Sequence, residues 1–302
     1  MWRATGFDAV FFWGGSGPKP KSWNASVQMQ AFAHIMAPDT TSQAQARQQD
    51  MRQGFEFNMR KVLLTGATRG IGRALVDQLA ARGAQVLAVG RDPSTVAQLV
   101  QECPAVLDGM AADLGEISAV QSVADWVKDR HPDTSVVINN AAIMHRCSLT
   151  DPDQDYLDMI ATEIAVNLRA PLALSVALLP ILNRQDSAAI VNVTTGLAIA
   201  PRPDAAVYCA TKAGLRSFTR ALRDQCRQAG TSIQLTEVVM TLVDTELTAP
   251  VMTQKYPPAR AAADLIRGVE AGLAEVWVEK AKMLRLVYRL SPTLAYRIMR
   301  TR

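Results

Sequence analysis

Residues Lys61–Gly72 read KVLLTGATRGIG, and this stretch decides the fold. A short apolar run enters a turn with glycines at 66, 70 and 72, and a helical pattern follows to about residue 82. Such a turn leaves backbone N–H groups free at the positive end of a helix, which suits a pyrophosphate. Gly66 permits the tight turn, Gly70 a close approach of the ligand, and Gly72 close packing of helix on strand. The stretch therefore predicts a strand–turn–helix unit that binds a dinucleotide.

The rest of the chain repeats this alternation of apolar strands and helical patterns. Of its 302 residues, 49% are hydrophobic, enough for one large core. Strands that are apolar throughout are typical of a parallel sheet covered by helices on both faces. We therefore expect a single Rossmann-type, doubly wound α/β domain with a parallel sheet of about seven strands.

Two arginines near the glycine turn bear on the choice of cofactor. The second strand, from Ala84, ends in Val89-Gly90-Arg91 and carries no acidic residue that could bind a ribose 2′-hydroxyl. Arg69 adds a second guanidinium, and guanidinium groups match phosphate oxygens well. We interpret Arg69 and Arg91 as a clamp for a ribose 2′-phosphate, which favours NADP(H) over NAD(H). The alternative is that both are solvated surface arginines.

Further along, Tyr208 and Lys212 stand four residues apart. On a helix both side chains leave the same face. A positive charge near a phenol stabilises the phenolate and lowers its pKa, which would make Tyr208 a general acid/base. The same spacing arises by chance on amphipathic helices, so the pair gains meaning from the other motifs.

Together these motifs resemble the short-chain dehydrogenase/reductase family over roughly residues 60 to 250. The resemblance rests on the glycine turn, the Tyr–Lys pair and four further motifs: Asp113-Leu114, Asn139–Ala142, Asn167 and Val191–Gly196. The segments Thr162–Pro171, Thr194–Ala198 and Val243–Leu247 further resemble a bacterial subgroup named for the D-alanine esterification operon.

The resemblance implies a role for each matching residue. The catalytic set would be Asn167, Thr195, Tyr208 and Lys212, acting on a small carbonyl or alcohol. Thr195 would hydrogen-bond the substrate oxygen, and Asn167 would hold a water that relays protons from Lys212. The cofactor would be held by residues of the glycine turn and of six later positions: Gly66, Thr68, Arg69, Gly70, Ile71, Arg91, Asp113, Leu114, Asn140, Val243 and Thr245, together with Tyr208 and Lys212.

Three positions depart from the family pattern. Thr195 stands where Ser is usual, which keeps the hydroxyl and adds a methyl group that narrows the site. Ala142 replaces a glycine. The segment Met240-Thr241 lacks the usual proline, which leaves the rigidity of the carboxamide-binding loop open.

Composition excludes several other functions. The four cysteines show no metal or disulfide spacing and fit a reducing cytoplasm, and the three histidines form no ligand cluster, so no metal is expected. His145, just past the Asn139-Asn140 strand end, is expected in a surface loop or at the substrate mouth. No stretch is apolar for about 18 residues, so no membrane span is predicted.

The first 58 residues do not resemble the family. We expect them to be a disordered extension without a signal peptide, followed by the catalytic domain over residues 59–279. Met59 directly precedes the first strand, so a mis-assigned start at this methionine is a further hypothesis.

The last residues, 280–302, contain seven basic side chains and no acidic one. The whole chain has a formal net charge of +4, so residues 1–279 without these seven charges have a net charge of −3. We therefore expect no nucleic-acid-binding surface on residues 1–279. Helical spacing of Met283, Leu286 and Leu290 predicts a basic amphipathic tail. It could contact an anionic membrane weakly, or dock on its own domain or a partner subunit.

The resemblance also implies a homodimer or homotetramer, built on the helices that carry Asn167 and Tyr208. The leading hypothesis is an NADP(H)-dependent carbonyl reductase or alcohol dehydrogenase. The alternative is a regulatory or scaffold protein that binds the cofactor and has a vestigial catalytic site.

Overall fold

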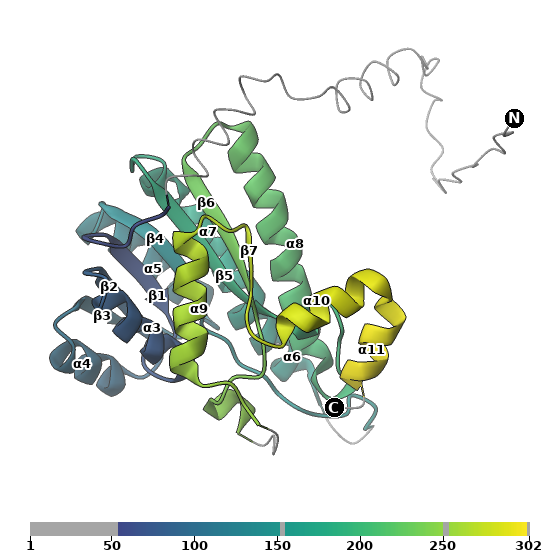
Figure 1. Ribbon diagram of the computed structural model, residues 1–302. Helices are drawn as coiled ribbons and strands as arrows, with labels where there is room; N and C mark the ends of the chain where they lie inside the picture. Colours follow the sequence, from purple (N-terminus) through teal and green to yellow (C-terminus); the bar gives the residue numbers. More distant parts are fainter. Residues whose placement is uncertain (1–53, 152–154, 250–253, 301–302) are drawn as a thin grey trace, which may run out of the picture. The chain divides into compact units, whose positions relative to one another are not determined.

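The computed structural model describes residues 54–151, 155–249 and 254–300. They build a seven-stranded sheet in the order β3-β2-β1-β4-β5-β6-β7, with every pair of neighbours parallel (Figure 1). The strands are β1 (Lys61–Thr65), β2 (Gln85–Gly90), β3 (Val106–Ala111), β4 (Thr134–Asn139), β5 (Ala188–Thr195), β6 (Ile233–Met240) and β7 (Glu275–Trp277). The predicted doubly wound α/β fold is confirmed.

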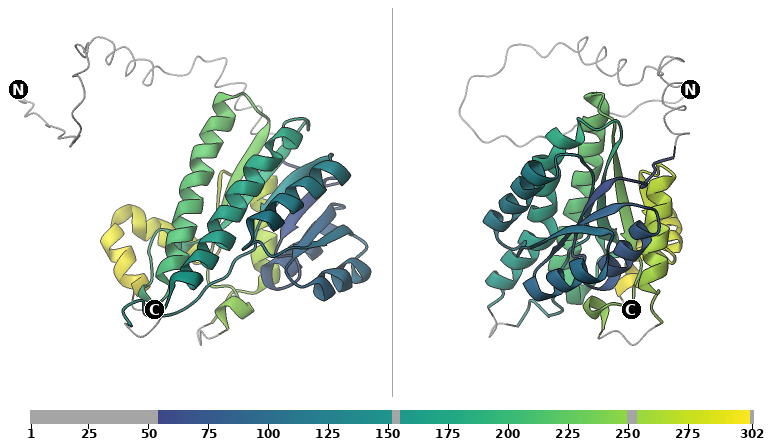
Figure 2. Two further views of the ribbon diagram at one scale, coloured as in Figure 1. Left: turned by 180° about the vertical axis from the view of Figure 1, so that it is seen from behind. Right: turned by 90° about the vertical axis from the view of Figure 1, so that its left-hand side faces the viewer.

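Helices cover both faces of this sheet (Figure 2). One face carries α3 (Gly70–Ala80), α4 (Pro93–Glu102) and α9 (Pro258–Glu270), and the other carries α5 (Ile117–Arg130), α7 (Ala170–Leu182) and α8 (Ala206–Gln228). Successive side chains of one strand point to opposite faces, so Leu64 joins the first cluster of buried residues and Leu63 the second. This double burial explains why the strands are apolar throughout.

Helix α7 continues a longer run that starts with α6 (Leu157–Ile164) and passes through one π-helical segment, η1 (Ala165–Arg169). The whole run, Leu157–Leu182, is long and apolar enough to cross a membrane by length and composition alone, with a mean hydropathy of 1.8 over an 18-residue window, where the sequence predicted no such span. Its α7 part packs on α5, β4 and β5. Burial inside the α/β fold explains the apolar character of the α7 side chains that face the sheet.

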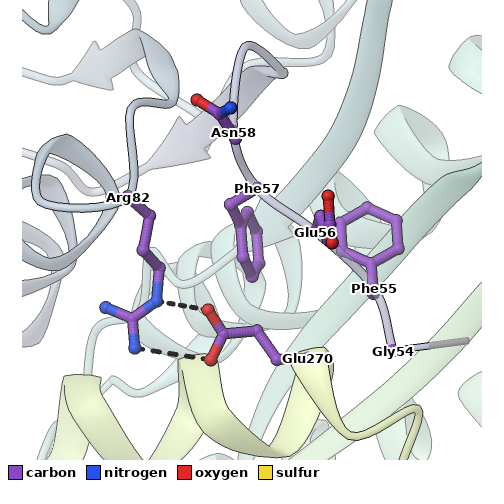
Figure 3. A pocket seen from close by; sticks show the side chains of 7 residues that line it. All are labelled: Gly54, Phe55, Glu56, Phe57, Asn58, Arg82 and Glu270. Carbon is purple, nitrogen blue, oxygen red and sulfur yellow. Dashed lines mark hydrogen bonds and ion pairs between the residues drawn. The ribbon is translucent and has the colours of Figure 1, made fainter.

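The ordered body includes residues before the first strand. Phe55 and Phe57 keep only 6% and 2% of their surface exposed and pack edge to face against each other. The backbone N–H of Phe55 donates to the carbonyl of Glu270 at the end of α9. Figure 3 shows the Phe57 ring next to the ion pair of Arg82 with Glu270 and the Phe55 ring farther along the same segment; all four residues line an open pocket of about 390 Å³. Residues 1–53 of the expected extension lie outside the described residues.

After β7 the chain forms two short helices, α10 (Ala281–Leu290) and α11 (Pro292–Arg300). Pro292 starts α11, because its missing N–H is harmless in the first turn of a helix. The two helices pack on each other, beside the end of β7 (Figure 1).

Candidate active site

The predicted site residues gather at the carboxyl ends of the central strands. The turn after β1 has φ of +66° at Gly66 and +54° at Gly70, a conformation that favours glycine. A Cβ at Gly72 would stand 1.8 Å from the Gly66 carbonyl oxygen, and one at Gly70 would stand 3.0 Å from a methyl group of Thr245. The glycines therefore permit a tight turn at the start of α3, a cradle whose backbone N–H groups suit a pyrophosphate.

Neighbouring residues hold this cradle in place. The Asn140 side chain donates to the carbonyl oxygens of Thr65 and Gly66, at 3.0 and 3.2 Å. The Thr65 hydroxyl accepts the backbone N–H groups of Asn140 and Ala141. Asn140 therefore ties β4 to the glycine turn.

Tyr208 and Lys212 lie one turn apart on α8, as predicted. The Lys212 Nζ stands 5.9 Å from the centre of the Tyr208 ring and donates to the backbone carbonyl of Val193 at 2.9 Å. Both side chains are buried, and Ala142 and Met144 pack beside the phenol. The pair is thus fixed against the end of β5.

Thr195 closes β5 and begins the short helical turn η2 (Gly196–Ala198). Its hydroxyl accepts the backbone N–H of Leu197 at 3.3 Å. Leu197 in turn packs against the cluster that contains Tyr208. Thr195 and Tyr208 therefore belong to one wall of the site.

Asn167 lies in the π-helical segment η1, which is fully buried at this residue. Its Oδ1 accepts from the Ile143 N–H at 2.9 Å, and its Nδ2 donates to the Ile143 carbonyl at 2.8 Å. A weaker bond of 3.4 Å reaches the hydroxyl of Thr211 on α8. Asn167 thus clamps the loop after β4, and single π turns of this kind are frequent at functional sites.

Burial dominates the electrostatics of the Tyr–Lys pair. It raises the pKa of the Tyr208 phenol above its ordinary value, and the Cys209 thiol and the Glu163 carboxylate raise it further. Burial also lowers the pKa of Lys212 to about 8. The sequence predicted that Lys212 would lower the phenol's pKa. The direction is opposite here, because burial disfavours both charged forms and the ammonium donates to Val193 instead.

Glu163 is a site residue that the sequence did not single out. It lies on α6, four residues before Asn167, and its side chain is fully buried. Its Oε1 accepts from the backbone N–H of His145 and lies 3.2 Å from Nδ1 of the same residue. Among the described residues, its Oε2 has no hydrogen-bond partner. The sequence does contain a signal for Glu163, because it is an acidic residue on a largely apolar helix, one turn before Asn167.

The two arginines differ in their surroundings. Arg69 forms a surface ion pair with Glu246, in the short turn η4 (Glu246–Thr248). Arg91 is exposed directly after β2, and Asp92 accepts the N–H groups that begin α4. Asp92, the first carboxylate after β2, is therefore used as a helix cap.

The remaining predicted cofactor residues surround the turn. Thr68 packs against the end of β2, where a Cβ at Gly90 would meet its methyl group at 2.8 Å. Ile71 packs on the core below the turn, and Leu114 is buried on the opposite face of the sheet. Asp113 is exposed and accepts the N–H of Gly115.

The segment after β6 is held without the family's proline. Val243 pairs with Tyr256 in an isolated parallel bridge, and the Thr241 hydroxyl donates to Glu279 at 3.1 Å. Thr245 and Thr248 form reciprocal caps at the start of η4. These ties rigidify the loop beside Gly70. Within the described residues, no group of His, Cys, Asp and Glu could hold a metal ion.

The sequence is similar to those of known proteins. A sequence profile of short chain dehydrogenases matches residues 60–256. The uncharacterized oxidoreductase DltE of Bacillus subtilis is 36% identical over 186 residues, which are 62% of this chain and 72% of that protein. An L-xylulose reductase of Caenorhabditis elegans is 30% identical over 198 residues, which are 65% of this chain and 77% of that protein.

Solved structures resemble the fold. A short chain dehydrogenase from Burkholderia cenocepacia, in complex with NADP, superimposes with a TM-score of 0.72 at 23% identity, covering 81% of this chain and 99% of that one. One from Burkholderia phymatum, in complex with NAD, gives 0.71 at 20% identity, covering 80% and 96%. At these identities the likeness concerns the fold.

Proposed function

Because the chain belongs to the short-chain dehydrogenase family and is an oxidoreductase, we propose that it interconverts a carbonyl and an alcohol by hydride transfer, with NADP(H) as cofactor and Tyr208 as general acid/base. The observation that carries this proposal is the fixed Tyr208–Lys212 pair at the end of β5, where Lys212 donates to Val193, two residues before Thr195. It faces the same end of the sheet as the glycine cradle, so a bound nicotinamide and a substrate oxygen can meet there.

Each side chain then has one task. Tyr208 gives its proton to the carbonyl oxygen during reduction, and the Thr195 hydroxyl donates to the same oxygen. Lys212 would hold the ribose hydroxyls of the cofactor when it is bound. The side-chain amide of Asn167 is hydrogen-bonded to the backbone of Ile143 and is not free for a water. We therefore assign Asn167 to holding the widened helix turn, at which a relay water would bind.

The nicotinamide group supplies the hydride when it is bound. The glycine cradle would hold its pyrophosphate, and Thr245 with the Val243 backbone would orient the carboxamide. Arg91 supports the preference for NADP(H), because it is exposed after β2 while Asp92 is engaged as a helix cap. Arg69 contributes less charge, because Glu246 neutralises it. Relatives of this fold bind either NADP or NAD.

The cofactor preference can be tested separately from catalysis. Arg91→Ala should weaken NADPH binding by about tenfold or more and leave NADH binding almost unchanged, since it removes one charge-assisted contact to the 2′-phosphate. Arg130→Ala, an exposed arginine at the end of α5, is the matched control. Equal losses for both cofactors would contradict the assignment.

We further propose that the protein acts in the cytoplasm as a homodimer or homotetramer. Free cysteines at four positions fit a reducing compartment. Exposed apolar side chains on the helices of the expected interface, Ile164 and Val176, support self-association. Light scattering coupled to gel filtration measures the assembly directly.

The central test is NADPH oxidation with a panel of small aldehydes, ketones and quinones. Tyr208→Phe should reduce turnover by about 10²-fold or more while NADPH still binds. Tyr296→Phe, an exposed tyrosine on α11, should behave as the wild type. Turnover that survives Tyr208→Phe refutes the acid/base assignment. Binding without turnover on any substrate would favour a regulatory protein with a vestigial site.

A further inference from the structure

Helix α10 presents an apolar stripe to solvent. Met283, Leu286 and Leu290 are 69%, 61% and 79% exposed, although these side chains are among the most apolar in the chain. Their spacing of three and four residues places them on one side of the helix. Only Ala281 of this helix is fully buried. An apolar stripe that is this exposed on a folded domain indicates an interaction site for a protein or a membrane.

A basic stripe runs directly beside the apolar one. Lys282, Arg285 and Arg289 follow at the same spacing, one position before Met283, Leu286 and Leu290, and all three are exposed. Residues 280–302 carry seven basic side chains and no acidic one. The exposed face of α10 therefore combines apolar insertion with positive charge, as helices on anionic bilayers do.

A groove adds aromatic and guanidinium groups at the edge of this face. It has a volume of about 410 Å³, and residues of α8, β7 and α10 line it, Trp277 among them. The Arg285 guanidinium stands 5.3 Å from the centre of the Trp277 ring. Arg289 and Tyr288 line the same groove.

The charges of this groove divide into two groups. Arg216 and Arg220 are paired with Glu237 and Glu275. Arg285 forms no ion pair with any carboxylate in the described part of the chain, and the same holds for Arg289. The two outer guanidinium groups therefore keep their charge for an anionic partner.

We propose that α10 and α11 form a docking surface for an anionic lipid membrane. Met283, Leu286 and Leu290 would enter the boundary of the acyl chains, and Lys282, Arg285 and Arg289 would meet phosphate head groups. Tyr288 and Tyr296, both partly exposed, suit the interface between the two regions.

Charge decides between this partner and the alternatives. A second copy joined about a two-fold axis would bring two basic stripes together, because such a contact pairs a patch with itself. An acidic protein could match the charge. However, the apolar stripe stands on a convex helix with long, flexible side chains, which suits insertion into lipid better than packing against a rigid surface.

The docking surface adjoins the candidate active site. A Cβ at Gly196, next to Thr195, would come within 2.7 Å of the Leu284 side chain of α10. Ile199 packs with Trp277 and Ala281 on the same side. Docking would therefore bring the Thr195 wall of the site near the head groups. The inference itself rests on the surface and not on the proposed reaction.

The experiment is co-sedimentation of the full chain with vesicles, repeated at low and high salt. Phosphatidylcholine vesicles with about a third phosphatidylglycerol should bind the protein, and pure phosphatidylcholine should bind it at least tenfold more weakly. Binding to the anionic vesicles should fall as salt rises. Equal binding to both compositions, or to neither, overturns the proposal.

Point substitutions then locate the surface. Leu286→Ser with Leu290→Ser, and separately Arg289→Glu, should each weaken binding at least tenfold. The matched controls are Ile117→Ser and Arg130→Glu, which change an exposed apolar and an exposed basic residue of α5. Circular dichroism confirms that each variant is folded. Unchanged vesicle binding in the α10 variants overturns the proposal, as does an altered oligomer mass in gel filtration with no change in vesicle binding.

Discussion

A chain that begins at Met59 should be much less stable than one that begins at Gly54. The shorter chain lacks Phe55 and Phe57, whose rings are buried under α9. Burying one phenylalanine side chain contributes about 1.5–3 kcal/mol, so the two rings together contribute about 3–6 kcal/mol. That is a large part of the roughly 5–15 kcal/mol by which a domain is stable.

Other contacts would be lost with the rings. The backbone bond from Phe55 to Glu270 disappears, and so does the Phe55 ring below the guanidinium of Arg60, 4.7 Å from its centroid. The ion pair of Arg82 with Glu270 would lose its apolar cover (Figure 3). The predicted loss is therefore at least about 3 kcal/mol.

The assay is urea unfolding without cofactor, followed by circular dichroism, because a bound cofactor would mask part of the loss. The chain starting at Gly54 is the control, since it keeps both rings. Phe57→Ala in the full chain should cost about 3–5 kcal/mol by itself, and Leu107→Ala, at an exposed position, much less. Equal urea midpoints for the two truncated chains would refute the reasoning and make Met59 an adequate start.

Three further predictions concern the site. Gly72→Ala should destabilise the fold by about 1–3 kcal/mol in urea unfolding and weaken NADPH binding, because its Cβ would collide with the Gly66 carbonyl. Glu163→Gln should shift the limb of the pH–rate profile that Tyr208 controls to lower pH, because the Glu163 charge raises the pKa of that phenol; an unshifted profile would exclude this role. The pKa of Lys212 is about 8 in the fold and 10.5 ordinarily, so the unfolded chain binds more protons between these values. Its contribution to the free energy of unfolding should therefore rise with pH across that window and be absent in Lys212→Met, whereas equal pH slopes of the two proteins would contradict it.

Local sequence signals predicted the framework well. The apolar strands and the glycine turn act through neighbours in the chain, so the fold and the cradle at Gly66–Gly72 could be inferred from spacing alone. The Tyr208–Lys212 pair could be placed on one helix face for the same reason. The pKa shifts of Tyr208 and Lys212 could not be predicted from the sequence, because they come from burial, which the packing of α8 on the sheet produces.

Contacts between distant segments were the part that sequence could not supply. Phe57 reads as part of a tail, yet it packs under α9, about 200 residues later in the chain. Glu163 reads as one acidic residue on a helix, and only the fold brings its carboxylate to the loop at His145. The Met240-Thr241 segment looked unsupported, because its tie to Glu279 spans 38 residues.

That last tie also determines how the C-terminal helices should be tested. Glu279 holds Thr241 in the loop beside the cofactor cradle, and α10 begins two residues later. Within α10, Leu284 lies against Gly196 beside Thr195. Deleting residues 280–302 would thus uncover one wall of the site as well as remove the basic stripe. A loss of activity after deletion would not identify a membrane contact, whereas substitutions at Leu286, Leu290 and Arg289 leave the Leu284–Gly196 contact in place and separate the two roles.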